Sequence, residues 1–188
     1  MACSLTAGRS VPCKSAFGGI KEVRFADFGS IKSITIDGTG EATIVPEGSP
    51  KYFSYKVKGN SSLETTVTSS RENGTTFYTQ TLTLTLPFLD ALTNAELYQV
   101  AISRPYAIVI DYYGNAFLCG LNNGMELTGG TIVTGAAAGD LSGFTITMEG
   151  MEENAPWFLK VVPDAEAPAG DINPTPAGTP PLAGVSTS

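Results

Sequence analysis

Apolar and polar residues alternate along much of the chain, and the longest such stretch runs from Ser62 to Leu86. Its two arms meet at Asn73-Gly74, a pair that tolerates the positive φ angles of a tight two-residue turn. With that turn, Leu63 lies opposite Leu84, and one face of a long β-hairpin is largely apolar. The other face is polar and β-branched, and it gathers Ser62, Glu64, Thr66, Thr68, Thr79, Thr81, Thr83 and Thr85.

Shorter alternating segments flank this hairpin and are separated by turn residues. They are Ile20–Phe28, Ile31–Ile36, Ala42–Val45 and Lys51–Lys58 before it, and Tyr106–Tyr112, Ala116–Leu121, Met125–Leu127, Thr131–Thr134 and Phe144–Glu149 after it. Trp157 and Phe158 are expected to seal the edge of the core. The pattern predicts a mainly β fold, an antiparallel β-sandwich or partial barrel with a long β-hairpin.

One segment, from Phe88 to about Val100, follows Pro87, lacks glycine and is predicted to form the one α-helix. Thr93 and Glu96 have the spacing of a capping box if the helix begins late. Its expected buried stripe consists of Leu89, Leu92, Leu97 and Val100.

The composition changes near both ends of the chain. Residues 1–20 are irregular and rich in Ser and Gly, residues 21–162 carry the strand pattern, and residues 163–188 are rich in Pro and lack periodicity. We therefore expect an extended N-terminal arm, one β domain and a Pro-rich C-terminal extension. No apolar run is long enough to span a membrane, and the N-terminus does not resemble a secretory signal.

Charge is distributed unevenly along the chain. Residues 1–60 carry eight Lys/Arg and five Asp/Glu, which gives +3, whereas residues 61–188 carry three and thirteen, which gives −10. An acidic chain without a basic stripe is poorly suited to grip nucleic acid, although its surface could repel phosphate along a conduit. The split also suggests a hypothesis in which the basic part of one copy meets the acidic part of another.

Candidate chemistry is sparse. The chain has no histidine, which removes the usual general base near neutral pH and most transition-metal sites. Cys3, Cys13 and Cys119 lack zinc-site spacing; a Cys3–Cys13 bridge stays open, and Cys119 is expected to be buried. Gly135–Gly139 lacks the Lys-Ser or Lys-Thr of a phosphate loop and is expected to be a flexible loop. We therefore expect that the protein is not an enzyme and that it binds neither a metal nor a cofactor.

Two further groups leave alternatives open. Glu149, Glu152 and Glu153 could form an acidic cluster, but a solvated strand end is the simpler interpretation. Tyr52, Tyr112 and Tyr113, if exposed, could stack on sugars, as in a carbohydrate-binding or adhesin module.

Several short motifs resemble virion structural proteins of tailed bacteriophages, most closely tail tube proteins. They are Met1-Ala2-Cys3-Ser4-Leu5-Thr6, Cys13-Lys14, Gly18-Gly19-Ile20-Lys21, Arg104-Pro105-Tyr106, Gly114-Asn115, Gly124-Met125-Glu126 and Gly139-Asp140-Leu141-Ser142-Gly143-Phe144. The resemblance covers roughly residues 1–158. It implies rings, typically hexameric, that stack into a hollow tube through which the genome passes, with each subunit contributing strands to a shared inner barrel.

This resemblance implies roles for particular residues. Either hairpin face could meet the lumen, and the polar face is the candidate: Glu64, Thr66, Thr68, Thr79, Thr81 and Thr83. Candidates for contacts between subunits are Lys14, Lys21, Arg24, Arg71, Asn73, Gly74, Asp140 and Glu149. The expected partners are further copies of the chain and other tail proteins, with DNA passing unbound, in a virion tail assembled in the host cytoplasm. A neck, baseplate or head decoration protein is the nearest alternative.

Overall fold

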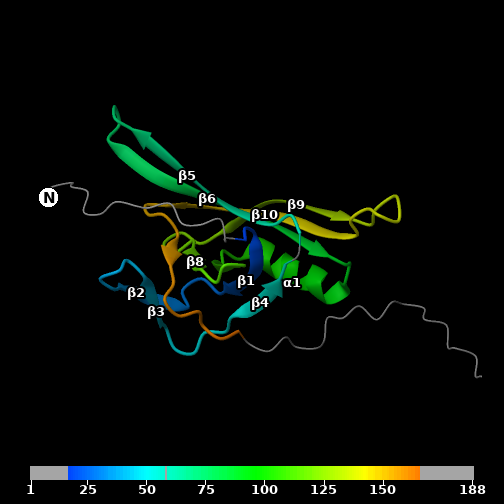
Figure 1. Ribbon diagram of the computed structural model, residues 1–188, viewed down its shortest axis with the longest axis horizontal. Coiled ribbons are helices and arrows are strands. Elements are labelled where there is room, and N and C mark those ends of the chain that lie inside the picture. The colour runs from blue at the N-terminus through cyan, green and yellow to red at the C-terminus, as the bar shows by residue number, and fades with distance from the viewer. Residues whose placement is uncertain (1–16, 58, 166–188) are drawn as a thin grey trace, which may run out of the picture.

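The computed structural model describes residues 17–57 and 59–165, and it is mainly β, with antiparallel sheets and one helix, as predicted (Figure 1). A five-stranded sheet contains, in spatial order, β11 (Trp157–Phe158), β8 (Ala116–Cys119), β7 (Tyr106–Asp111), β1 (Ile20–Ala26) and β4 (Phe53–Lys56). A four-stranded sheet contains β5 (Ser62–Ser70), β6 (Thr75–Pro87), β10 (Gly143–Glu152) and β9 (Glu126–Val133). A small sheet pairs β2 (Ile31–Ile36) with β3 (Ala42–Pro46), and the helix is α1 (Ala91–Ile102).

The five-stranded sheet is covered on both faces. One face shares a buried core with the four-stranded sheet, to which β6 contributes every second residue from Leu82 to Leu86 and β10 every second residue from Phe144 to Met148. The other face packs beneath the β2–β3 hairpin, around Ile31, Ala42 and Ile108. Period-two alternation along the strands therefore directs apolar side chains into these two cores. The finer choice between a sandwich and a partial barrel stays a prediction.

The register of the long hairpin differs from the predicted one by two residues. Leu63 lies opposite Leu82 rather than Leu84, and Ser70 lies opposite Thr75. The loop is a four-residue turn from Arg71 to Gly74, in which only Gly74 has a positive φ. A two-residue type I′ turn needs positive φ at both central residues, which Asn73 does not adopt here. Because the shift is an even number, every side chain keeps its predicted face.

Helix α1 starts later than the predicted segment, and a different residue caps it. Asp90 is the N-cap, and its carboxylate accepts hydrogen bonds from the amides of Leu92 and Thr93. Because the helix begins before Thr93, the predicted capping box of Thr93 and Glu96 is wrong, and Asp90 satisfies free amides of the first turn instead. Leu97 and Val100 are buried as predicted, but Leu92 is 44% exposed, so that part of the predicted stripe is wrong.

Several other boundaries also differ. The strand predicted over residues 51–58 is confined to Phe53–Lys56, and Tyr52 beside it is buried rather than available for stacking on sugars. The two short strands predicted at 125–127 and 131–134 form the single strand β9, because a register shift absorbs Thr128 into it. Phe158 is 51% exposed, so it does not seal the core's edge.

The chain after β11 lies across the five-stranded sheet and is held by backbone and side-chain contacts. The amide of Leu159 donates to the carbonyl of Ala116 at 2.8 Å, and the amide of Lys160 donates to the carbonyl of Ala42 at 3.0 Å. Arg24 donates to the carbonyl of Pro163, so ordered contacts extend past the predicted boundary at residue 162. Residues 1–16 of the predicted arm and residues 166–188 of the Pro-rich extension lie outside the described residues, and Ile20, the last residue assigned to the arm, begins β1 and is buried.

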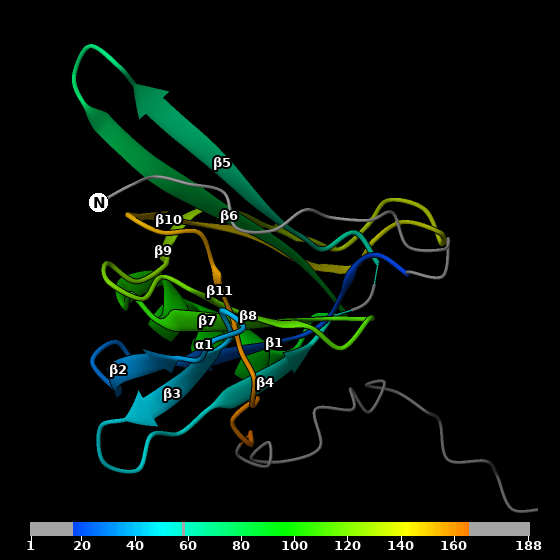
Figure 2. The same cartoon turned by 60° about the vertical axis from the view of Figure 1, so that its left-hand side comes forward.

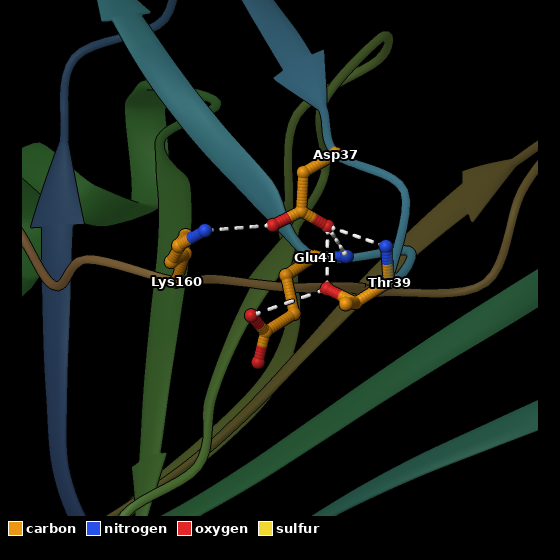
Figure 3. A network of polar contacts seen from close by, with 4 residues as sticks. All are labelled: Asp37, Thr39, Glu41 and Lys160. Carbon is orange, nitrogen blue, oxygen red and sulfur yellow. Dashed lines mark hydrogen bonds and ion pairs between the residues drawn. The ribbon is translucent and has the colours of Figure 1, made fainter.

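A polar network at the β2–β3 turn fastens this segment (Figure 3). Asp37 accepts hydrogen bonds from the amides of Thr39 and Glu41, at 2.9 and 3.1 Å, and forms an ion pair of 2.9 Å with Lys160. Hydrogen bonds from Thr39 and Lys160 hold the pKa of Asp37 well below its ordinary value. The hydrogen bond and charge of Asp37 raise the pKa of Lys160 in turn.

We predict that Lys160→Ala speeds amide hydrogen exchange at positions 159 and 160, because the segment loses its side-chain anchor. The pair is exposed, so the melting temperature should hardly change. A lowered carboxylate pKa and a raised ammonium pKa both keep the pair charged, so its contribution should be constant from about pH 5 to about pH 9. The contribution of the pair to stability should decrease when the pH is below the ordinary pKa of Asp or above the ordinary pKa of Lys. Lys32→Ala on β2 is the control, and equal exchange in both variants would contradict the prediction.

Candidate functional site

The outward face of the four-stranded sheet is the most distinctive surface among the described residues. Its core side buries Leu82 and Leu84 of β6 and Phe144 and Ile146 of β10, so the residues that alternate with these along each strand point outward. The register places Thr85, Thr145 and Thr131 side by side across three strands. We call this surface the threonine face, and its threonines are Thr66, Thr68, Thr79, Thr81, Thr83, Thr85, Thr131, Thr145 and Thr147.

The structure brings together all six residues that the sequence placed on the polar side of the hairpin. Glu64, Thr66 and Thr68 lie on β5, opposite Thr81, Thr79 and Phe77 of β6. Sequence reasoning missed the continuation of this face over β10 and β9, at Thr145, Thr147, Thr131 and Glu126. The alternation from Phe144 to Glu149 was visible, but nothing local indicates that β10 pairs with β6.

The threonine face is acidic and lacks cations. The four strands of this sheet contain no Lys or Arg. Glu64 and Glu149 flank Thr81 from the two neighbouring strands, and Glu126 lies beside Glu149. Such a surface has a negative potential and remains hydrated through its hydroxyl groups.

Basic residues gather in the other sheets instead. Lys21 and Arg24 lie on β1, Lys56 on β4 and Lys32 on β2. Arg24 is engaged inside the molecule, since its guanidinium donates to Glu22 at 2.6 Å. Partial burial raises the pKa of Glu22, but hydrogen bonds from Arg24 and Ser54 and the nearby cations lower it overall. The uneven charge along the sequence therefore places the basic residues of these strands in the five-stranded and two-stranded sheets and leaves the four-stranded sheet acidic.

The tip of the β5–β6 hairpin projects beyond the rest of its sheet (Figure 2). Strand β10 ends at Glu152, opposite Tyr78, so the last three pairs of the hairpin have no third strand beside them. Val67 is 55% exposed although it lies on the core side. Three of the predicted inter-subunit residues, Arg71, Asn73 and Gly74, lie at this exposed tip.

The other predicted inter-subunit residues do not join that tip. Lys21 and Arg24 lie on the five-stranded sheet, Glu149 lies on the threonine face, and Lys14 falls outside the described residues. Asp140 lies in the loop between β9 and β10. It accepts hydrogen bonds from the amides of Ala137 and Ala136, at 2.8 and 2.9 Å, which lower its pKa. The candidates therefore occupy several separate surfaces.

Two buried polar side chains hold the turn between β8 and β9 beneath the sheet. Gln80 accepts a hydrogen bond from the amide of Gly120 at 3.0 Å, and Glu152 accepts from the amides of Asn122 and Asn123. Glu152 is 4% exposed, so the interpretation of residues 149–153 as a solvated strand end is wrong for this residue. A carboxylate can be buried here because three N–H···O contacts satisfy it.

The same turn brings together two of the motifs quoted for the resemblance. The amide of Met125 donates to the carbonyl of Pro105 at 3.0 Å. Gly124 has a φ of +77°, and a Cβ there would lie 2.6 Å from the carbonyl oxygen of Arg104. A side chain at position 124 would therefore collide with the backbone, which explains why glycine occupies this position.

The described residues hold no cluster of three or more His, Cys, Asp or Glu side chains suited to a metal ion. Cys119 is buried as predicted, and burial together with the nearby Glu152 raises the pKa of its thiol far above the ordinary value. A thiol in this state is a poor nucleophile. Cys3 and Cys13 lie outside the described residues.

Comparison with known proteins gives no relative: no family model, no curated protein and no solved structure matches the chain. Within the part of the chain that the structure describes, no helix is long and apolar enough to cross a membrane.

We predict that Glu152→Gln lowers the free energy of unfolding by about 1–3 kcal/mol, because an amide NH₂ would replace the carboxylate oxygen that contacts the amide of Asn122, and the remaining hydrogen bonds would lose their charge. Glu153→Gln is the matched control, since this neighbouring side chain is exposed and should change stability by less than about 0.5 kcal/mol. Urea denaturation followed by circular dichroism measures both. Equal midpoints for the two variants would show that Glu152 does not hold the turn.

Proposed function

We propose that this chain is a structural protein of a phage tail, whose copies form rings that stack into a hollow tube for genome passage. The observation that carries the proposal is the four-stranded sheet, which combines a cation-free threonine face with two edge strands, β5 and β9, that pair with no further strand among the described residues. The motif resemblance points to the same class of protein.

Strand directions favour closure of this sheet between copies. The sheet has four antiparallel strands, so β5 and β9 run in opposite directions. If copies are related by rotation about an axis roughly parallel to the strands, β9 of one copy meets β5 of the next in antiparallel sense. Nine residues of β5 match eight of β9 in length. Pairing them removes both free edges and makes one barrel from all copies.

The threonine face lines the lumen in this arrangement. Phosphate is repelled by Glu64, Glu126 and Glu149, and no ammonium or guanidinium group on these strands binds it. Threonine hydroxyls keep the wall hydrated without fixed positive charge. DNA can therefore slide through without being held, which a conduit requires. The core side of the same sheet keeps the wall attached to the rest of the subunit.

A second candidate is a sugar-binding module, favoured by aromatic residues at one end of the five-stranded sheet. Phe17 and Tyr112 pack edge to face with ring centroids 5.2 Å apart, and Phe17 and Tyr113 are both mostly exposed. Such rings can stack on sugars or contact protein. Glycan-array binding by a monomer would favour this module over the tube.

Electron microscopy of the purified chain, with mass measured in solution on the same sample, tests the tube proposal. We expect rings or tubes with a central hole. A persistent monomer at high concentration, or solid filaments, would contradict it. Repeating the preparation at increasing salt tests the charge hypothesis, since attraction between the basic and acidic parts should weaken with salt. Tube formation that is insensitive to salt would refute that hypothesis alone.

We also predict that Thr81→Lys converts the lumen into a surface that retains DNA. Each ring would place one ammonium group per copy along the wall, and retention at low salt should rise about tenfold or more, with a steeper salt dependence. Thr43→Lys, at an exposed position of β3, adds the same charge away from the sheet. Filter binding of short DNA to assembled tubes measures both. Equal retention by the two variants would place the threonine face outside the lumen.

A further inference from the structure

Helix α1 lies against β9 and contributes Leu97 and Val100 to the core shared by the two large sheets (Figure 1). Burial raises the pKa of Tyr55 on β4 to about 12, and the charge of Glu96 on the helix adds to this effect. The helix thus fills the flank of the domain at the β9 edge of the four-stranded sheet.

The outward side of α1 is also apolar. Ala91, Ala95, Tyr98 and Ile102 recur at intervals of four, three and four residues, which places them on one side of the helix, opposite Leu97 and Val100. Tyr98 is 64% exposed and Ile102 65% exposed. Glu96 is the only charged residue in the helix. A helix that is apolar on opposite sides is normally covered on both.

Among the described residues no strand pairs with the outer edge of β9, which exposes an apolar residue as well. Ile132 lies opposite Phe144 in the register, on the core side of the sheet, yet it is 63% exposed. Since α1 and β9 adjoin, we call the exposed apolar residues of these two elements, Ile132 of β9 and Tyr98 and Ile102 of α1, the α1–β9 flank. It combines an edge strand of the described sheet with apolar side chains.

The chain carries a matching surface on the opposite edge of the same sheet. The core side of β5 presents Leu63, Thr65, Val67 and Ser69, none of which is charged. Leu63 is only half-buried, and Val67 is 55% exposed. When β5 of a second copy pairs with β9 in antiparallel sense, the core side of that β5 lies on the core side of the extended sheet. Ile132 and α1 lie on this same side.

We propose that the α1–β9 flank receives the β5 edge of a second copy of this chain, so that α1 is a subunit contact as well as part of the core. The proposal rests on the proposed function and adds the helix to the strand pairing. A specific interface generally buries about 1,000 Å² or more, which an eight-residue ladder alone does not provide. The outward side of α1 supplies the additional apolar area, covered by Leu63, Val67 and the projecting hairpin of the second copy.

The first test places a charge on the helix. Ile102→Asp in the full chain should leave the monomer folded, because this side chain is mostly exposed, and should raise the concentration needed for ring or tube formation at least tenfold. Val161→Asp is the matched control, since Val161 is 60% exposed and lies in the segment after β11, away from α1. Assembly of Ile102→Asp at the same concentration as Val161→Asp would overturn the proposal.

The second test does not depend on tubes. In a Cys3→Ser, Cys13→Ser background, a Val67→Cys chain is mixed with an Ile102→Cys chain and treated with a short bismaleimide. We expect a cross-linked dimer, and far less of it when Val161→Cys replaces Val67→Cys. Cross-linking without tubes would support the flank contact and refute the tube. Tubes without this cross-link would refute the flank contact and leave the tube proposal standing.

Discussion

The pairing of β6 with β10, over ten residue pairs from Gly143–Pro87 to Glu152–Tyr78, is the interaction on which the rest of the structure depends. It aligns two alternating sequences so that their apolar residues fall on one face and their threonines on the other. The core needs this alignment, and so does the threonine face. Gly143 permits it, because a Cβ there would lie 2.2 Å from the carbonyl oxygen of Leu86.

The buried polar groups give this sheet a defined relation to the sheet beneath it. Gln80 and Glu152 come from the paired strands β6 and β10, and both bind backbone amides of the turn between β8 and β9. An apolar side chain at either position would leave those amides without a partner. Hydrogen bonds of this kind fix orientation, whereas apolar packing alone tolerates sliding. This turn positions Met125 in the core and also positions the start of β9.

The two edges of the four-stranded sheet connect the proposed function to the further inference. Within the described part of the chain, strands β5 and β9 are the edges of this sheet, and each exposes an apolar residue on the core side, Val67 and Ile132. Free edges of this kind invite association, and charged or proline residues usually guard them. Neither is present on the core side of β5. Head-to-tail pairing between copies would satisfy both edges with one contact, and the apolar outward side of α1 would be covered by the same contact.

The sequence by itself determined the mainly β class, the faces of the long hairpin and the burial of Cys119, because alternation and residue type act locally. It also placed Glu64, Thr66 and Thr68 on one surface, since a shift of two residues changes partners but not faces. Only the tertiary structure decided that β10 and β9 extend that surface, that Glu152 is buried and that no other described segment covers the outward side of α1. Those outcomes depend on which distant segments pair and pack, and the residues involved carry no local signal of their partners.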